Sequence, residues 1–199
     1  MEIIKCNQED WDNFTRKSPD YTIFNDVKFL EIFEGAYDYL LCLKGNDVVA
    51  GICCNVENGD VVRLPYQVYS GLLYANMSGL KLYRMNEDRF RAGECVSKYL
   101  MDNYGEVTFG NHWNVQDIRP FQWENYHERK NGYYDVDIRY TSILDISNPL
   151  DMSGYSKSRR QAVRKGEEYG LITKEIFQID EFMALYNRTF FAARYFTFK

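Results

Sequence analysis

The segment Tyr37–Leu64, YDYLLCLKGNDVVAGICCNVENGDVVRL, decides the fold class of this 199-residue chain. Two apolar runs of strand length are joined by residues 44–47, KGND, and the second run ends at Asn58-Gly59. An Asn-Gly pair between apolar runs is the strongest short signal for a two-residue hairpin turn. The segment therefore predicts a three-stranded antiparallel meander, with strands over residues 37–43, 48–56 and 61–64.

Helices and further strands are expected on both sides of this meander. Apolar residues at helical spacing, such as Trp11 and Phe14 and later Val96 and Leu100, indicate helices that each bury one face. The predicted helices span residues 8–17, 26–34 and 86–104, and the further strands span 3–6, 66–74, 106–109 and 133–146. A largely antiparallel sheet flanked by helices is an α+β fold.

A proline and a change of charge divide the chain near Pro149. Acidic side chains outnumber basic ones up to residue 150, and basic ones are in excess after it. The predicted elements beyond this point are a helix over 153–169, a strand over 171–177 and a helix over 180–193. We expect one domain over 1–147 and the beginning of a second, similar unit over 148–199. At roughly 150 residues per domain, this second unit looks truncated.

Composition narrows the class of protein. The chain has a net charge of -5, no run of about 20 apolar residues and no apolar signal-peptide region at its start, so we expect a cytoplasmic protein without a transmembrane segment. Five cysteines without CxxC spacing and only two histidines disfavour a disulfide framework and a zinc site. We expect no metal, no permanently bound cofactor and no DNA partner.

The most informative motif is SKSRRQAVRKGEEYG, residues 156–170. On a helix, Lys157, Arg160 and Arg164 fall at i, i+3 and i+7 and form one positive stripe. Such a stripe can bind phosphate, because arginine presents a planar fork and lysine a point charge. A solvated face, partly balanced by Glu167 and Glu168, is an equally good interpretation.

A second cluster is DIRPFQW, residues 117–123, followed by Tyr126. Asp117 and Arg119 are close enough in sequence to pair, and Trp123 with Tyr126 can line a cleft. An arginine beside aromatic rings can bind a carboxylate or a phosphate. A packed corner with a satisfied ion pair is the interpretation that such clusters favour more often.

No pattern marks a nucleophile or an acid–base pair. Ser70 lies in Tyr-Ser-Gly rather than in G-x-S-x-G. Cys53 and Cys54 fall in the most apolar strand and are expected in the core. Asp135 and Asp137 alternate along one strand and are expected to face solvent. The catalytic residues are therefore unassigned.

Three stretches resemble the GNAT-like acyltransferases related to the Fem-type peptidoglycan bridge enzymes: 117–123, DIRPFQW; 139–145, RYTSILD; and 156–166, SKSRRQAVRKG. The pairing of 49–51, VAG, with 69–73, YSGLL, is similar too. The likeness covers roughly residues 20–192 and is sharpest in the Arg/Lys helix. It implies two tandem GNAT-like domains, with donor and acceptor bound in and between them.

The resemblance also implies a reaction. Fem-type relatives transfer an amino acid from aminoacyl-tRNA to a peptidoglycan precursor, and others in the wider group are acetyltransferases. The chain is then an N-acetyl- or aminoacyltransferase, or the N-terminal part of one. Acyl-CoA or aminoacyl-tRNA is the expected donor, and a small-molecule or peptidoglycan-precursor amine the acceptor. Two alternatives stay open: a non-catalytic module that binds an anionic partner through the basic helix, and an inactive fragment.

Overall fold

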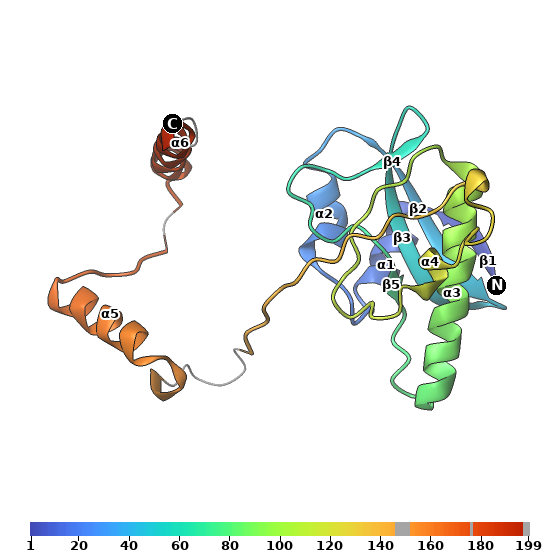
Figure 1. Ribbon diagram of the computed structural model, residues 1–199, viewed down its shortest axis with the longest axis horizontal. Coiled ribbons are helices and arrows are strands. Elements are labelled where there is room, and N and C mark those ends of the chain that lie inside the picture. The colour runs from blue at the N-terminus through green and yellow to red at the C-terminus, as the bar shows by residue number, and fades with distance from the viewer. Residues whose placement is uncertain (146–151, 176, 197–199) are drawn as a thin grey trace. The chain divides into compact units, whose positions relative to one another are not determined.

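The computed structural model describes residues 1–145, 152–175 and 177–196 (Figure 1). The chain divides into two compact units, Met1–Thr141 and Ser142–Lys199, and each is described by itself. The boundary expected between residues 147 and 148 lies outside the described residues. The domain limits therefore stay a prediction.

The first unit is built on an antiparallel sheet in the order β1-β2-β3-β4, with β5 also paired to β3 (Figure 1). The Asn58-Gly59 turn has positive φ at both residues, 54° and 90°, as a tight hairpin turn requires, so the predicted meander is confirmed. The strands are β1 (Glu2–Cys6), β2 (Ala36–Lys44), β3 (Asp47–Glu57), β4 (Asp60–Val62) and β5 (Leu73–Tyr74).

Strands β4 and β5 pair with the same strand, β3, at different places along it, and together they occupy one strand position of the sheet. Val62 lies opposite Asn55, so an unbroken strand would place residue 66 opposite Gly51, where Leu73 is found instead. About seven residues are thus looped out of the sheet between the two pieces. The strand expected over 66–74 is reduced to β5 for this reason, and most of that stretch is loop.

Helices cover both faces of the sheet, which confirms the α+β class. One face packs Trp11 and Phe14 of α1 and Leu30 of α2 against β2 and β3, while the other packs Val96 and Leu100 of α3. Trp11 is fully buried, and its indole N–H donates to the Asn25 carbonyl at 3.1 Å. The helical elements of this unit are α1 (Gln8–Thr15), the 3-10 turn Ile23–Asn25, α2 (Val27–Leu30), α3 (Leu82–Asn103), α4 (Arg119–Gln122) and the 3-10 turn Arg129–Asn131.

Two predicted strands at the end of this unit are wrong. Residues 106–109 form only one parallel bridge, between Val61 and Val107, and residues 133–145 form no strand. Tyr134 is held instead by its hydroxyl, which donates to the Ser97 carbonyl at 2.8 Å. Alternating side chains predict a strand only where a sheet edge is free to pair with it. Asp135 and Asp137 are exposed, as predicted.

Helix boundaries differ less from expectation. Asp26 caps α2 by accepting from the Lys28 N–H at 2.8 Å, but α2 ends at Leu30 rather than at residue 34. Helix α3 begins at Leu82, four residues before the predicted start. Cys53 and Cys54 are buried in the core, as predicted.

The described part of the second unit contains helices joined by irregular segments, and no strand. The expected strand over 171–177 is absent from residues 171–175 and from residue 177, while residue 176 lies outside the described residues. Gly170, at φ 69°, ends α5 as predicted. No helix in the described ranges is both long and apolar enough to span a bilayer. The elements are the 3-10 turn Met152–Gly154, α5 (Lys157–Glu168) and α6 (Ile179–Phe196).

Candidate functional site

The predicted pairing of Asp117 with Arg119 is confirmed at the start of α4. The guanidinium donates through Nε to Oδ1 at 2.8 Å and through Nη2 to Oδ2 at 2.6 Å, a bidentate geometry. These hydrogen bonds hold the pKa of the Asp117 carboxyl below its usual value. The same guanidinium lies over the rings of Phe90 and Trp123, 5.2 and 5.3 Å from their centroids.

This corner is already satisfied internally. Both forked nitrogens of Arg119 face Asp117, so a ligand anion meets a cation that has a carboxylate partner. Tyr126 meets this corner through its backbone, whose N–H donates to the Trp123 carbonyl at 3.1 Å, while its ring packs edge-on against His127 with 5.0 Å between the ring centroids. The corner therefore resembles a packed structural element. A substrate-binding role for Arg119, Trp123 and Tyr126 stays a prediction.

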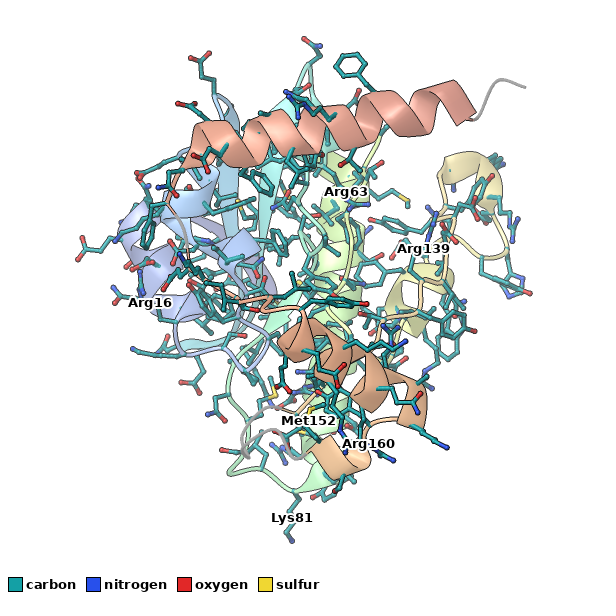
Figure 2. The ribbon with its side chains drawn as sticks, turned by 90° about the vertical axis from the view of Figure 1, so that its left-hand side faces the viewer. Arg16, Arg63, Lys81, Arg139, Met152 and Arg160 are labelled. Carbon is teal, nitrogen blue, oxygen red and sulfur yellow. The ribbon has the colours of Figure 1, made fainter. Side chains whose placement is uncertain are left out.

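The basic helix α5 does not present its three cations equally. Arg160, labelled in Figure 2, turns back on the chain before the helix and donates to the carbonyls of Ser153, at 3.1 Å, and Tyr155. Lys157 and Arg164 are exposed and have no ion pair with any described residue. The free charges of the predicted stripe are thus Lys157 and Arg164, two helical turns apart.

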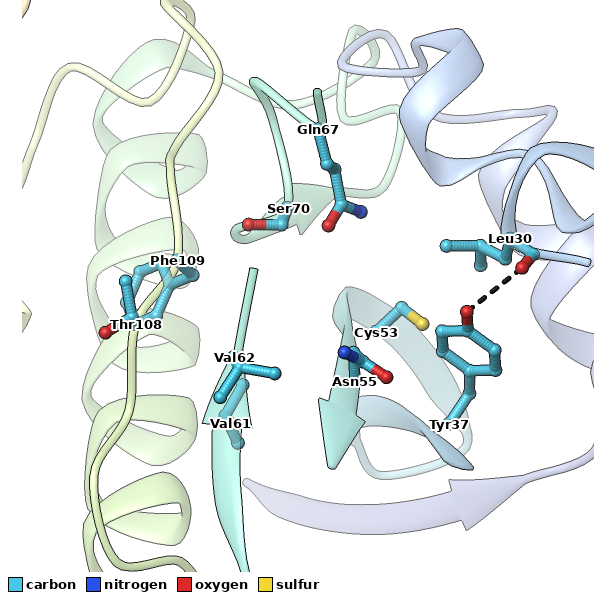
Figure 3. A pocket seen from close by; sticks show the side chains of 10 residues that line it. All are labelled: Leu30, Tyr37, Cys53, Asn55, Val61, Val62, Gln67, Ser70, Thr108 and Phe109. Atoms are coloured by element: carbon cyan, nitrogen blue, oxygen red, sulfur yellow. Dashed lines mark hydrogen bonds between the residues drawn. The ribbon is translucent and has the colours of Figure 1, made fainter. Parts of the chain in front are cut away.

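A narrow crevice opens beside β4, where residues 62–69 separate from residues 106–110 (Figure 3). The Val61 N–H donates to the Glu106 carbonyl at 2.8 Å, and farther on the Ser70 N–H donates to the Gly110 carbonyl at 2.9 Å. Between these two attachments the chain of residues 62–69 bows outward. The gaps between its lining atoms, open solvent at the mouth included, add up to about 230 Å³, but no part of the crevice admits a water-sized sphere. Its lining residues are Leu30, Tyr37, Cys53, Asn55, Val61, Val62, Gln67, Ser70, Thr108 and Phe109.

The two arms of the crevice approach closely at Gly110. A Cβ at this position would lie 2.5 Å from the Val68 carbonyl oxygen, which is backbone and cannot move aside cheaply. Only glycine allows the bowed loop to sit against residues 106–110. The loop is also fastened by Arg63, whose guanidinium donates to the Gln67 carbonyl at 2.7 Å.

Most polar groups in the crevice have protein partners. The Tyr37 hydroxyl donates to the Leu30 carbonyl at 3.0 Å, and the Gln67 amide both donates to Phe24 and accepts from Leu64. Burial raises the pKa of the Cys53 thiol well above its ordinary value, so this cysteine is a poor nucleophile.

Asn55 is the exception. Its side chain is 95% buried, being 5% exposed, and Nδ2 donates to Glu57 Oε1 at 3.3 Å, but no donor in the described residues reaches Oδ1. Buried polar groups nearly always have a partner, so an orphaned acceptor in a crevice indicates an unmet N–H or O–H donor. Ser70 adds a hydroxyl whose oxygen accepts from the Gly110 N–H at 3.1 Å and whose own proton is left to donate.

A buried polar cluster beside β5 escaped the sequence analysis. The Asp20 carboxylate accepts from the Tyr74 N–H at 3.0 Å and from Asn114 Nδ2 at 3.1 Å. His112 Nδ1 lies 3.8 Å from Asp20 Oδ1 and accepts from the Asn114 N–H, while burial lowers the pKa of His112. These bonds join loops far apart in sequence, so no local spacing could have signalled them.

No group of three or more His, Cys, Asp or Glu side chains in the described ranges gathers as metal ligands do. No protein-family model matches the chain, and no curated protein matches it. Among solved structures, an aminoglycoside antibiotic 6′-N-acetyltransferase from Acinetobacter haemolyticus, in its apo form, is similar to 73% of this chain and 100% of its own chain. The identity is 11% and the TM-score 0.31, values at which the likeness supports no conclusion about function.

Proposed function

We propose that the unit Met1–Thr141 is an acyltransferase domain that binds an acyl-CoA donor through the crevice beside β4, which Asn55, Gln67 and Ser70 help to line. The observation that carries the proposal is the buried, unpartnered Asn55 Oδ1 in that crevice. The support from sequence is the resemblance to GNAT-like acyltransferases. The order of elements, an antiparallel sheet followed by α3 and then by a parallel bridge between Val107 and Val61, agrees with that resemblance.

The chemistry of the donor suits the polar groups of the crevice, which must widen to admit a ligand because no water-sized sphere fits in it. The pantetheine arm of coenzyme A is a slim chain that carries two amides, and each amide N–H can donate to a free acceptor such as Asn55 Oδ1. An extended ligand can pair with backbone groups where a sheet is parted. An aminoacyl-tRNA could enter only with its 3′ end. The slim pantetheine arm requires the smaller widening of the crevice, and this favours acyl-CoA as donor over aminoacyl-tRNA.

Transfer needs no covalent enzyme intermediate. The acceptor amine attacks the thioester carbonyl, the carbon–sulfur bond breaks, and the amine proton is passed to the leaving thiolate. Positioning the two reactants and donating hydrogen bonds to the oxyanion supply most of the barrier reduction in such reactions. The Ser70 hydroxyl is a donor in the crevice that can take the second role.

The test is thermal unfolding of the full chain with acetyl-CoA. A ligand that binds only the native state at 100 times its Kd stabilises by roughly 2.7 kcal/mol, a Tm rise of about 5–10 °C. Thr108→Phe places a large ring at the edge of the crevice and should abolish the shift, whereas Thr141→Phe makes the same change at an exposed site away from the crevice and should retain it. No shift in the unmodified chain at millimolar ligand contradicts the proposal.

The Fem-type assignment is the finer alternative within this class. It uses aminoacyl-tRNA as donor and a peptidoglycan-precursor amine as acceptor. A charged minihelix RNA in place of acetyl-CoA tests it in the same assay. Stabilisation by the RNA that survives Thr108→Phe would favour the Fem-type donor and a binding site outside the crevice.

A non-catalytic binding role is the second candidate, and α5 favours it. Lys157 and Arg164 are exposed without an acidic partner among the described residues. An anionic polymer that binds them should lose affinity steeply with salt, and the paired change Lys157→Ala and Arg164→Ala should reduce that salt slope. Arg160→Ala is the matched control, because this guanidinium already serves backbone carbonyls.

A further inference from the structure

Helix α3 runs along strand β2 in the opposite chain direction, and two polar contacts fix its alignment. Near the start of the helix, Lys44 Nζ lies 2.7 Å from Asp88 Oδ1. Just past its end, the Tyr104 hydroxyl donates to Asp38 Oδ2 at 2.6 Å. The helix is therefore pinned to β2 at both ends.

This alignment brings Cys95 over Cys42. Cys95 precedes Tyr104 by nine residues, about 13 Å along a helix, and Cys42 follows Asp38 by four residues, about 13 Å along a strand. The two advances match, so the alignment of α3 on β2 places the two thiols beside each other, close enough to affect each other's pKa. Both side chains belong to the same apolar cluster between α3 and the sheet.

The strand register excludes two other disulfide pairings, Cys42 with Cys54 and Cys6 with Cys53. Cys54 lies opposite Asp38 and Cys42 opposite Ala50, so these two thiols are four residues apart along the ladder, about 13 Å. Cys6 and Cys53 flank Tyr39 from either side, so a whole strand separates them by about 9.6 Å. Both spans exceed the ~7 Å limit between Cα atoms for a disulfide.

The two thiols of the close pair differ in reactivity. The hydrogen bond from Cys42 lowers the pKa of Cys95; burial opposes this, the Met1 amino group assists it and Glu2 opposes it. Cys42 is fully buried, whereas Cys95 is half-buried on the helix. The thiolate is the reactive form of cysteine, so an oxidant reaches and oxidises Cys95 first.

We propose that Cys95 and Cys42 are a peroxide-oxidisable dithiol whose disulfide ties α3 to β2. The Cys95 thiolate attacks hydrogen peroxide, the O–O bond breaks, and a sulfenic acid and hydroxide form. The Cys42 sulfur then attacks the Cys95 sulfur; the S–S bond forms, the S–O bond breaks, and the Cys42 proton leaves with the hydroxyl as water. Overall, two thiols are oxidised and one peroxide is reduced to two waters.

The test treats the reduced full chain with hydrogen peroxide, blocks the remaining thiols with a maleimide and maps the peptides by mass spectrometry. The expected result is a linked Cys42–Cys95 peptide, a fall from five free thiols to three, and recovery of all five with dithiothreitol. A chain in which Cys42 stays free while Cys95 is unmodified or converted to sulfinic acid overturns the proposal. So does a linkage that uses Cys6, Cys53 or Cys54.

Single variants separate the role of Cys95, which attacks peroxide, from that of Cys42, which then forms the disulfide. Cys95→Ser should leave Cys42 reduced, and Cys42→Ser should leave Cys95 as a sulfenic acid that dimedone traps. Cys42→Ala, which removes the donor, should also slow alkylation of Cys95 by iodoacetamide several-fold at neutral pH. Cys6→Ser, the matched control on the opposite face of the sheet, should oxidise as the unmodified chain does. Oxidation of Cys42 in Cys95→Ser, or loss of the Cys42–Cys95 linkage in Cys6→Ser, contradicts the proposal.

Discussion

The two units of this chain use the same helical periodicity and reach different burial. In Met1–Thr141, the apolar stripe of α3 meets a sheet, and Val96 and Leu100 are almost completely buried. In Ser142–Lys199, the apolar residues of α6 follow an equally helical spacing, yet Phe182 is 56% exposed. Periodicity therefore predicts where a helix forms, whereas burial needs a second layer that the local sequence does not specify.

The largest expected effect contrasts one aromatic side chain from each unit. Trp11→Ala removes a fully buried ring and its hydrogen bond to Asn25 and should cost about 3–5 kcal/mol of unfolding free energy. Phe182→Ala should change the same quantity by no more than about 0.5 kcal/mol. Urea unfolding followed by far-ultraviolet circular dichroism measures both, since this signal reports the helices of both units, whereas all three tryptophans lie in the first unit. Equal costs for the two changes would remove the contrast between the units.

A smaller effect is expected from filling space between α1 and β3. A Cβ at Gly51 would lie 2.7 Å from Phe14 and 3.1 Å from the Leu40 carbonyl, so Gly51→Ala should cost about 1–3 kcal/mol. Gly79→Ala is the control, because nothing lies within 4 Å of its added Cβ, and it should be neutral or slightly stabilising. The Tm of both variants checks this packing. A neutral Gly51→Ala would show that α1 packs loosely on the sheet.

The smallest effect concerns the charge that pins α3 to the sheet. Burial acts to raise the pKa of Asp38, but hydrogen bonds from Lys5 and Tyr104 outweigh it and lower the pKa below the ordinary 3.8. A carboxyl with a lowered folded-state pKa stabilises the fold above pH 4, and this contribution is lost as the pH falls below that value. Asp38→Asn should therefore cost about 1 kcal/mol at pH 7 and less near pH 3.

Urea titrations at the two pH values measure this difference. Asp135→Asn is the matched control, since Asp135 is exposed on the same unit and should show no pH-dependent cost. A cost of Asp38→Asn that is the same at pH 3 and pH 7 would falsify the role given to its charge.

Local signals in the sequence predicted the elements that depend on neighbouring residues. The Asn58-Gly59 turn, the Asp26 cap and the Asp117–Arg119 pair each join positions a few residues apart, and each was found. The strand expected over 133–146 was wrong in the described residues 133–145: alternation does not say which edge a strand pairs with, and these residues pair with none, although β1 is an edge strand.

The candidate site could not be predicted in the same way. The crevice brings together Asn55, Ser70 and Gly110, residues that only the interruption between β4 and β5 makes neighbours. The turning of Arg160 toward Ser153 depends on the path of the chain before α5, which carries no periodic signal. Sequence patterns found the basic helix, but they could not show which of its cations are free.

Binding of acetyl-CoA to the crevice is the most direct test of the central claim. Isothermal titration calorimetry of the full chain, compared with Asn55→Leu and Thr108→Phe and with Thr141→Phe as control, measures it. The account predicts binding by the unmodified chain and the control, a loss of about tenfold or more in affinity for Asn55→Leu, and no binding by Thr108→Phe. Equal binding by all four proteins, or none by the unmodified chain, would contradict the assignment of the crevice as the donor site.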